Sequence, residues 1–232
     1  MYSSQLNDLL EEKKDLTALL SHDLRIPLRN VKTFNQLLLE QEDDSVKELA
    51  GMIYESTQEQ TALLESVLEI LRQDHLFFSG VVNTEIAPEQ LITETIAGFE
   101  LLASQKNIQL KKNIRHKGLI AVQPELFTQV LKNITSNAIK FSYSGSEIHF
   151  SVYEKDHRVH IDVSDSGMGF DAKMGERLLD RFTKSGRRGT ADEPTTGIGL
   201  YLSRKIINHQ RGELTAFSPG PGKGSVFSIT LN

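Results

Sequence analysis

The chain has 232 residues, enough for one large core or two modest ones, and its 38% hydrophobic and 25% charged composition is ordinary for a globular protein. It has no cysteine, which excludes disulfides and thiolate chemistry. No apolar run approaches the roughly 20 residues that cross a bilayer, and the N-terminus lacks a signal-peptide core, so we expect a cytoplasmic chain or the soluble part of a longer protein.

Charge is unevenly distributed along the chain. Residues 1–80 carry seven Lys and Arg against fifteen Asp and Glu, whereas residues 81–232 carry nineteen against sixteen. An acidic first part and a mildly basic second part indicate two units, with any anionic ligand in the second. Chance asymmetry between two solvated surfaces explains the charges equally well.

Two helices are predicted at the start. Apolar residues recur at spacings of three and four from Leu6 to about Gln41, which predicts one long amphipathic helix. The polar stretch "EDDS" ends it, and Ser45 with Glu48 three positions later predicts a capping box that starts a second helix. Apolar residues at multiples of seven continue in that helix, so residues 1–77 are predicted to form an antiparallel hairpin.

A lone hairpin of this kind leaves much of its apolar stripe in water. Pairing two copies into a four-helix bundle would bury the stripe, so we expect a homodimer. The alternative is that the hairpin packs against the C-terminal domain of its own chain.

Residues 78–232 form the second predicted domain, in which helices and short strands mix. Pro88 and Pro124 each open a predicted helix. Strands are predicted in "VVNTEI", "IQLKKNI" and "LIAV", in two alternating segments around the loop "EKDHR", and in a final hairpin of "ELTAFS" with "SVFSITLN". This order predicts an α/β sandwich whose mixed sheet is covered on one face.

A histidine lies on the polar side of the first predicted helix. His22 lies about 200 degrees from both Leu20 and Leu24 on a helical wheel, so its imidazole is predicted to be exposed. A neutral ring can act as a nucleophile through nitrogen, and Asp23 beside it can orient the ring or accept its proton. Taken alone, a histidine and an aspartate on a helix surface are most often a solvated pair.

Three polar residues share a face of the helix that follows Pro124. Asn133 and Asn137 are four residues apart, and Lys140 follows three residues later. An asparagine oxygen is a hard ligand suited to Mg²⁺, and the lysine would meet a phosphate. Simple exposure on a helix surface is the plain alternative.

Two glycine-containing segments follow. In "DVSDSGMGF" a strand ends at Asp165, whose carboxylate can accept from an exocyclic amine such as adenine N6, while Gly167 and Gly169 allow backbone to approach the ring. A tight turn explains these glycines equally well. In "TTGIGLYLSRKII" the glycines open a helix whose N-terminus favours phosphate. The polar segment between them, "RFTKSGRRGTADEPTT", reads as a positively charged lid.

The order of these motifs resembles the catalytic core of two-component sensor histidine kinases over nearly the whole chain. "SHDLRIPL" is similar to the phosphoacceptor segment, "NITSNAIKF" to the N box, and "DSGMG" and "GIGL" to the two glycine boxes. "LLDRF" resembles the F box, and "GPGKGSVF" the terminal glycine segment. By this resemblance residues 78–232 have the ATP-binding fold shared with gyrase-type and heat-shock ATPases, and the hairpin forms a dimeric four-helix bundle.

The resemblance implies a role for particular residues. His22 is the phosphorylated residue, Asp23 assists proton removal, and Asn137 ligates Mg²⁺. The remaining implied nucleotide contacts for ATP are Asn133, Asn137, Lys140, Asp165, Gly167, Gly169, Phe182, Arg188, Thr196, Gly197, Gly199 and Leu200. The implied partners are a second copy of the chain, a response-regulator receiver domain and an upstream sensor module. A complete cytoplasmic kinase and the soluble part of a longer, membrane-anchored sensor would look the same in this sequence. No nucleic acid is expected.

The sequence departs from the family pattern at two positions. Ser166 stands where the first glycine box usually has asparagine, a change that we expect ATP binding to survive. Ile26 stands where the family commonly has threonine or asparagine to position the water that dephosphorylates the partner. Since isoleucine has no hydrogen-bonding atom in its side chain, we predict weak phosphatase activity.

Two rival functions are an ATPase of the related fold whose first helices only dimerise, and a degenerate kinase that acts as a scaffold. Neither rival function explains why a histidine, an acidic residue, an arginine and a proline occur together in "HDLRIP". The remaining histidines, including His75, His116 and His209, show no metal-ligand spacing and are predicted to be surface residues.

Overall fold

The computed structural model describes residues 29, 31–36, 38, 43–54, 56–58, 60–61, 83–180, 188–191, 193 and 199–232. The chain divides into two compact units, the first containing Met1–Val81 and the second beginning at Val82. The predicted domain boundary after residue 77 lies outside the described residues and stays a prediction. No helix in the described part of the chain has the length and apolarity that crossing a membrane requires.

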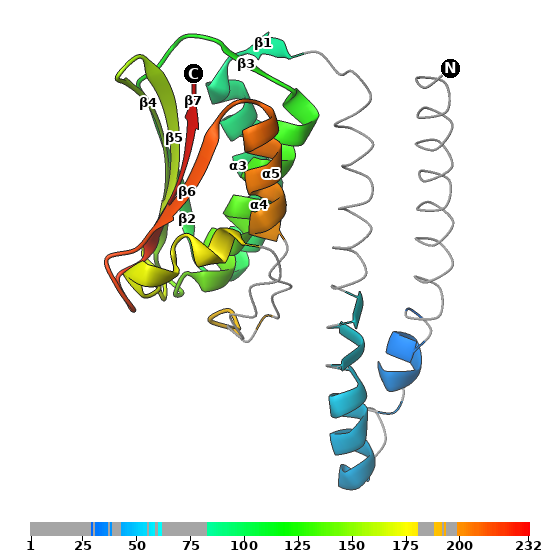
Figure 1. Ribbon diagram of the computed structural model, residues 1–232. Helices are drawn as coiled ribbons and strands as arrows, with labels where there is room; N and C mark the ends of the chain where they lie inside the picture. Colours follow the sequence, from blue (N-terminus) through cyan, green and yellow to red (C-terminus); the bar gives the residue numbers. More distant parts are fainter. Residues whose placement is uncertain are drawn as a thin grey trace, which may run out of the picture. The chain divides into compact units, whose positions relative to one another are not determined.

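The described residues of the first unit form two helical stretches (Figure 1). The first includes residues 31–36 and the second includes residues 44–54, and Asp43 lies between them. The ammonium of Lys32 in the first stretch lies 6.0 Å from the centroid of the Tyr54 ring in the second. A contact between residues on opposite sides of the turn requires the stretches to run in opposite directions. The antiparallel arrangement agrees with the predicted hairpin.

The second helix begins differently from the prediction. It starts at residue 44, and the backbone N–H of Ser45 donates a 2.9 Å hydrogen bond to Oδ1 of Asp43, to which the Ser45 hydroxyl also donates. These hydrogen bonds from Ser45 hold the pKa of Asp43 below its usual value. Asp43 is therefore the N-cap, and the predicted capping box of Ser45 and Glu48 is wrong. A carboxylate accepts more strongly than a hydroxyl and also complements the positive end of the helix dipole.

The second unit contains a five-stranded sheet with the strand order β2-β4-β5-β7-β6. β2 runs parallel to β4, and the other neighbours are antiparallel. These strands are β2 Gln109–Ile114, β4 Glu147–Lys155, β5 Arg158–Asp165, β6 Glu213–Phe217 and β7 Ser225–Leu231. The mixed sheet confirms the prediction. Two further strands, β1 Thr84–Ile86 and β3 Ile120–Val122, pair separately as a small antiparallel sheet.

Three helices cover one face of the large sheet (Figure 1): α3 Pro88–Gln105, α4 Pro124–Phe141 and α5 Gly199–His209. A proline stands in the first turn of α3 and of α4, as predicted, because its missing N–H costs nothing there. Two short 3₁₀ turns, Ala172–Met174 and Arg177–Leu179, follow β5. The arrangement confirms the predicted α/β sandwich with one sheet covered on one face.

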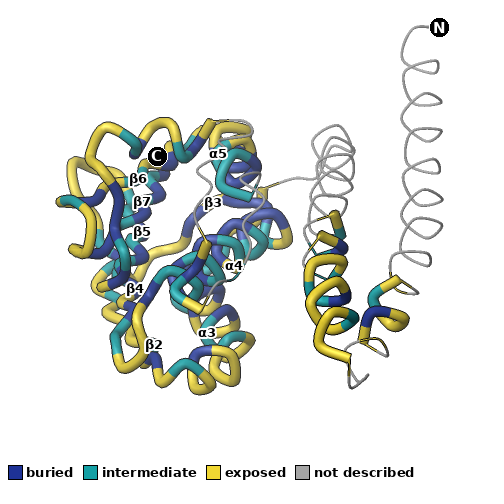
Figure 2. The backbone as a smooth tube through the Cα atoms, turned by 90° about the horizontal axis from the view of Figure 1, so that it is seen from below, coloured by how far each residue is buried: buried dark blue, intermediate teal, exposed yellow. Residues whose placement is uncertain are grey.

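The core lies between the sheet and the helices, where buried positions concentrate (Figure 2). Residues of β7 alternate between buried and half-buried, because successive side chains of a strand point to opposite faces. α4 contributes the largest set of buried helical side chains, spaced by three and four: Leu126, Phe127, Val130, Leu131, Ile134, Thr135, Ala138 and Ile139. This apolar stripe rests against the core and leaves the neighbouring positions of α4 for polar side chains.

The hairpin between β4 and β5 is tighter than predicted. Only Asp156 and His157 lie outside the strands, with φ angles of 52° and 59°. Two central residues with positive φ match the two-residue turn whose twist suits antiparallel strands. The predicted loop "EKDHR" is therefore too long, since Lys155 and Arg158 pair within the sheet.

Candidate nucleotide-binding site

The predicted N-box residues lie on α4, beside its apolar stripe. Asn133, Asn137 and Lys140 are all half-buried, whereas Ile134 and Ala138 next to them are buried. The spacing of four and three residues turns the three polar side chains toward the same side of the helix. The face that the sequence predicted therefore exists, and its polar groups are partly shielded from water.

α5 lies beside α4 through two close contacts. The Nδ2 atom of Asn133 donates a 2.9 Å hydrogen bond to Oγ of Ser203. A Cβ atom on Gly199 would lie 2.3 Å from Oδ1 of Asn133, so a larger residue there would displace the Asn133 amide. Gly199 and Leu200 are half-buried at this end of the helix. The structure thus brings the described part of the second glycine box to the N box.

Asp165 lies buried at the end of β5. Its Oδ1 atom accepts a 2.8 Å hydrogen bond from the backbone N–H of Gly167, and its Oδ2 atom accepts from the Ser225 hydroxyl. Burial raises the pKa of Asp165, and the hydrogen bonds from Ser225 and Gly167 oppose that rise. The two donors orient the carboxylate, and each oxygen keeps a second lone pair for a ligand.

The segment after β5 packs on the loop between β6 and β7. Gly169 has a φ of 54°, and a Cβ there would collide with the carbonyl oxygen of Gly220. The backbone N–H of Gly222 donates to the carbonyl oxygen of Met168 over 2.6 Å, and that of Gly224 donates to Gly167 over 3.0 Å. The terminal glycine segment therefore supports the first glycine box directly, a contact that the motif order did not reveal.

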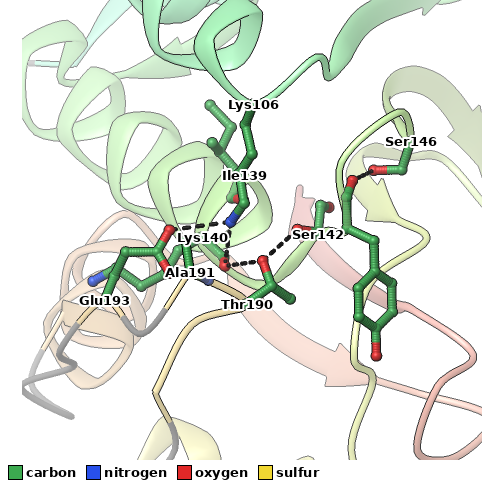
Figure 3. Close-up of polar contacts among 9 residues, drawn as sticks. Lys106, Ile139, Lys140, Ser142, Ser146, Thr190, Ala191 and Glu193 are labelled. Atoms are coloured by element: carbon green, nitrogen blue, oxygen red, sulfur yellow. Dashed lines mark hydrogen bonds and ion pairs between the residues drawn. The ribbon is translucent and has the colours of Figure 1, made fainter.

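Lys140 lies in the last turn of α4, next to the segment 188–191. Burial lowers the pKa of Lys140; Glu193 opposes this effect, and Lys106 adds to it. The carbonyl oxygen of Lys140 accepts from the backbone N–H of Thr190 over 3.0 Å and from the Lys106 ammonium over 2.8 Å (Figure 3). Two basic side chains and one acidic side chain thus gather at the carboxyl end of the N-box helix.

Sequence reasoning missed four residues that contact this site: Lys106, Glu193, Ser203 and Ser225. Ser225 had the strongest local signal, since it lies within the terminal glycine segment "GPGKGSVF". Glu193 and Ser203 lie within the predicted lid and the second glycine segment, but nothing in the spacing marked these two residues, and Lys106 lies outside every motif. They meet the site because the fold brings distant segments together.

Several predicted site residues fall outside the described residues: His22, Asp23, Phe182, Thr196 and Gly197. Arg188 is described and exposed, one residue before Gly189, which is buried against Lys140. Their predicted roles stay predictions.

A metal site built from acidic and imidazole groups is absent from the described residues, which contain no cluster of three or more His, Cys, Asp or Glu able to hold an ion. His116 is not the surface residue that we predicted. Its side chain is 14% exposed, Nδ1 lies 3.3 Å from Oε2 of Glu154, and Nε2 is buried without a hydrogen-bond partner. The prediction rested on the absence of metal-ligand spacing, which says nothing about burial, and in the structure the backbone at Gly118 lies against the ring.

Two family models match the chain in tandem. Residues 12–76 match the His Kinase A phospho-acceptor domain, and residues 122–232 match the histidine kinase-, DNA gyrase B- and HSP90-like ATPase. Together the two matches span well over half of the chain. The chain belongs to the sensor histidine kinases.

Relatives of this histidine kinase are considerably longer than the chain. The sensor protein KdpD of Clostridium acetobutylicum is 28% identical over 94% of this chain and 24% of its own length. The sensor histidine kinase WalK of Bacillus subtilis is 29% identical over 95% of this chain and 37% of its own length. The chain thus spans about a quarter to about a third of these two relatives.

Solved histidine kinases share the fold. The crystal structure of full-length ShkA in complex with AMPPNP matches with a TM-score of 0.63 and 21% identity, over 94% of this kinase and 45% of ShkA. At this identity the likeness concerns the fold, and it extends through both the hairpin and the α/β sandwich.

Proposed function

We propose that this kinase uses ATP to phosphorylate His22 on its own chain and then passes the phosphoryl group to an aspartate of a response regulator. One observation carries the proposal: a phospho-acceptor match that includes His22 precedes an ATPase-type match in the same chain. The first match supplies an acceptor and the second a donor site, which is what a phosphotransferase acting on itself requires.

The nucleotide would bind along α4 and the two glycine boxes of the second unit. Asp165 accepts from the adenine amine, and its orientation by Gly167 and Ser225 supports that role. ShkA, which shares the fold, forms a complex with the nucleotide AMPPNP. The other proposed contacts are Asn133, Asn137, Lys140, Gly167, Gly169, Phe182, Arg188, Thr196, Gly197, Gly199 and Leu200.

Asn137 fits the proposed role of Mg²⁺ ligand. Its side chain is half-buried on the face that Lys140 shares, and none of the described residues hydrogen-bonds its amide. A neutral hard oxygen suits Mg²⁺, whose remaining ligands would be phosphate oxygens and water. The ion, when bound, would neutralise charge on the transferring phosphoryl group.

In the proposed reaction at His22, one bond to the γ-phosphorus forms as another breaks. The lone pair of a neutral ring nitrogen attacks the γ-phosphorus, and an N–P bond forms while the bond from that phosphorus to the β–γ bridging oxygen breaks. ADP leaves with the electron pair, and Asp23 accepts the ring proton. The N–P bond then breaks as a carboxylate oxygen of the regulator attacks phosphorus.

We propose a homodimer formed through the first unit. Phe34, Leu49 and Met52 are 63%, 61% and 65% exposed on its helices, and a second copy would cover such side chains. The phospho-acceptor match supports this arrangement and a receiver domain as the partner. An upstream sensor module would regulate the kinase, and the described units would lie on the cytoplasmic side of any membrane anchor.

Ile26 leads us to propose that the kinase has weak phosphatase activity toward its regulator. The proposal follows from the side chain alone, which has no atom to orient a water molecule. We also propose that the domains divide as 1–77 for dimerisation and phosphotransfer and 78–232 for nucleotide binding.

Autophosphorylation tests the proposal directly. Incubation of the chain with γ-labelled ATP and Mg²⁺ should label the protein with an acid-labile, base-stable phosphoryl group. His22→Ala should abolish the label, whereas His149→Ala, which changes a half-exposed histidine of β4, should keep it. Full labelling of His22→Ala would refute the proposal, and ATP hydrolysis without any labelled protein would favour the ATPase rival.

A further inference from the structure

Ser218 is the first residue after β6, and it is completely buried. Its hydroxyl donates a 2.7 Å hydrogen bond to the carbonyl oxygen of Gly224, and the carbonyl oxygen of Gly220 is a second, longer acceptor at 3.1 Å. The same hydroxyl accepts a 3.0 Å bond from the backbone N–H of Phe170 and a 3.2 Å bond from that of Gly220. A hydroxyl has one donor and two acceptor sites, so these bonds use its full capacity.

The Ser218 hydroxyl closes the loop between β6 and β7. The ladder between these strands ends at the pair of Phe217 and Val226, and beyond it Gly220 and Gly224 have φ angles of 143° and 71°. A backbone with these angles does not continue the ladder, so the polar groups of the loop need other partners. The bond from Ser218 to Gly224 supplies one of them and joins the two ends of the loop.

The same hydroxyl also joins this loop to the first glycine box. Phe170, which donates to Ser218, directly follows the box in the chain. Gly224, which accepts from Ser218, donates its own N–H to the carbonyl oxygen of Gly167 inside the box over 3.0 Å. Ser218 therefore contacts both of the segments that pack together here.

The two donors that orient Asp165 lie on these same two segments. The N–H of Gly167 donates to Oδ1 and the hydroxyl of Ser225 donates to Oδ2. Ser225 directly follows Gly224, where a Cβ atom would collide with the carbonyl oxygen of Asp165. A shift of the loop relative to the glycine box would move one donor relative to the other, so the Asp165 carboxylate would lose its fixed orientation.

We propose that Ser218 is a positioning residue for adenine recognition, which holds the β6–β7 loop against the first glycine box and so keeps the Asp165 carboxylate aligned for the exocyclic amine of the base. This inference rests on the proposed function, because it assumes that Asp165 accepts from adenine. Ser218 acts through the backbone that it bonds. Its side chain is buried and does not contact the nucleotide itself.

Binding of adenosine and of inosine to the full chain tests the inference. Inosine has a carbonyl oxygen where adenosine has the exocyclic amine, so the ratio of the two affinities reports the alignment of the Asp165 carboxylate. The wild type should prefer adenosine, and Ser218→Ala should lower this preference about fivefold, the effect of weakening one hydrogen bond. Equal losses for the two nucleosides, or an unchanged preference, would show a merely structural role and overturn the inference.

Thr95→Val is the matched control, because it removes a buried hydroxyl that donates to the carbonyl oxygen of Leu91 in its own helix. Its preference for adenosine should equal that of the wild type. In an Asp165→Ala background the preference should already be low, and adding Ser218→Ala should not lower it further. A further loss in the double variant would overturn the inference, because Ser218 would then act by another route.

A measurement on the wild type tests the inference even if Ser218→Ala folds poorly. Adenosine should slow amide hydrogen exchange at Phe170 and Gly220, the two residues whose N–H groups donate to Ser218, because the bound base stabilises the arrangement that Ser218 holds. Unchanged exchange at both amides under saturating adenosine would overturn the inference. A wild type that binds neither adenosine nor ADP would refute the proposed nucleotide site itself and the inference with it, whereas the outcomes above refute the inference alone.

Discussion

The Nδ2 atom of Asn133 donates a 2.9 Å hydrogen bond to Oγ of Ser203, a residue 70 positions later in the chain. The bond joins the N-box helix α4 to α5, which begins at the second glycine box. It also orients the Asn133 amide, since Nδ2 donates to Ser203 and Oδ1 lies nearest to Gly199, one turn earlier in α5.

Ser203→Ala should lower the free energy of unfolding by about 1 kcal/mol, because it leaves the half-buried Asn133 donor without its acceptor. ADP should bind several-fold more weakly, because the Asn133 amide would no longer be held in one orientation. Chemical denaturation and calorimetric titration measure the two effects. The matched control is Ser104→Ala, which removes an exposed hydroxyl bonded to its own helix and should change neither quantity. Equal effects of both substitutions would contradict the prediction.

Asn137→Ala should remove most of the dependence of ATP affinity on Mg²⁺. In the wild type, chelation of Mg²⁺ should weaken ATP binding by on the order of tenfold or more, equivalent to about 1.4 kcal/mol or more. In the variant the affinities with and without Mg²⁺ should nearly coincide, since the protein ligand is lost. Titration with ATP in excess Mg²⁺ or in chelator measures the ratio. Asn113→Ala on β2, at an exposed position, is the control, and an unchanged ratio in Asn137→Ala would rule out Asn137 as the ligand.

As the pH is lowered, the affinity for ADP should begin to fall at a higher pH than it would if Asp165 had the pKa of an ordinary aspartate. Burial raises the pKa of Asp165, so the carboxylate that we propose accepts from adenine is protonated earlier on acidification. Asp165→Asn should weaken binding at neutral pH and remove this part of the pH dependence. ADP titrations from about pH 4 to pH 7 measure it. An identical pH profile in both proteins would contradict the assignment.

The same raised pKa has the opposite effect on folding. The folded state binds the Asp165 proton more tightly than the unfolded chain does, so this group contributes stability that is fully present below its unfolded pKa and is lost as pH rises through its folded pKa. Unfolding measured against pH should show this contribution in the wild type and not in Asp165→Asn.

Gly169→Ala should destabilise the second unit by about 3 kcal/mol, the sum of a left-handed backbone and a collision with backbone carbonyls. Gly145→Ala provides the matched control, since Gly145 has a φ of 82° but an added Cβ there would meet nothing within 4 Å. Its cost should be about 1 kcal/mol, from the backbone conformation alone. Denaturant unfolding measures both variants, and equal costs would show that the close approach at Gly169 is unimportant.

Ile26→Thr should increase dephosphorylation of the phosphorylated regulator by this kinase, while autophosphorylation at His22 changes little. A threonine hydroxyl can orient a water molecule toward the phosphoryl group, which isoleucine cannot. Time courses of phosphoregulator loss with each protein measure the effect. Efficient dephosphorylation by the wild type would refute the prediction of weak phosphatase activity.

Sequence spacing alone was enough to predict the helices that start at Pro88 and Pro124, the strands of the sheet and the face shared by Asn133, Asn137 and Lys140. These features depend on the 3.6-residue and 2-residue periods of helix and strand, which act over a few neighbouring residues. The errors at Asp43 and at the β4–β5 turn were also local. The capping residue Asp43 stands two positions before Ser45, and the two residues with positive φ, Asp156 and His157, stand inside the predicted loop "EKDHR".

Only the tertiary structure decided which distant groups complete the site. Ser225 meets Asp165 because β5 and β7 pair in that register, and Ser203 meets Asn133 because α5 packs on α4. Lys106 meets Glu193, 87 residues later, because β2 lies parallel to β4 and brings the ends of α3 and α4 together. Such contacts depend on how the whole core packs, and no short-range pattern in the sequence records them.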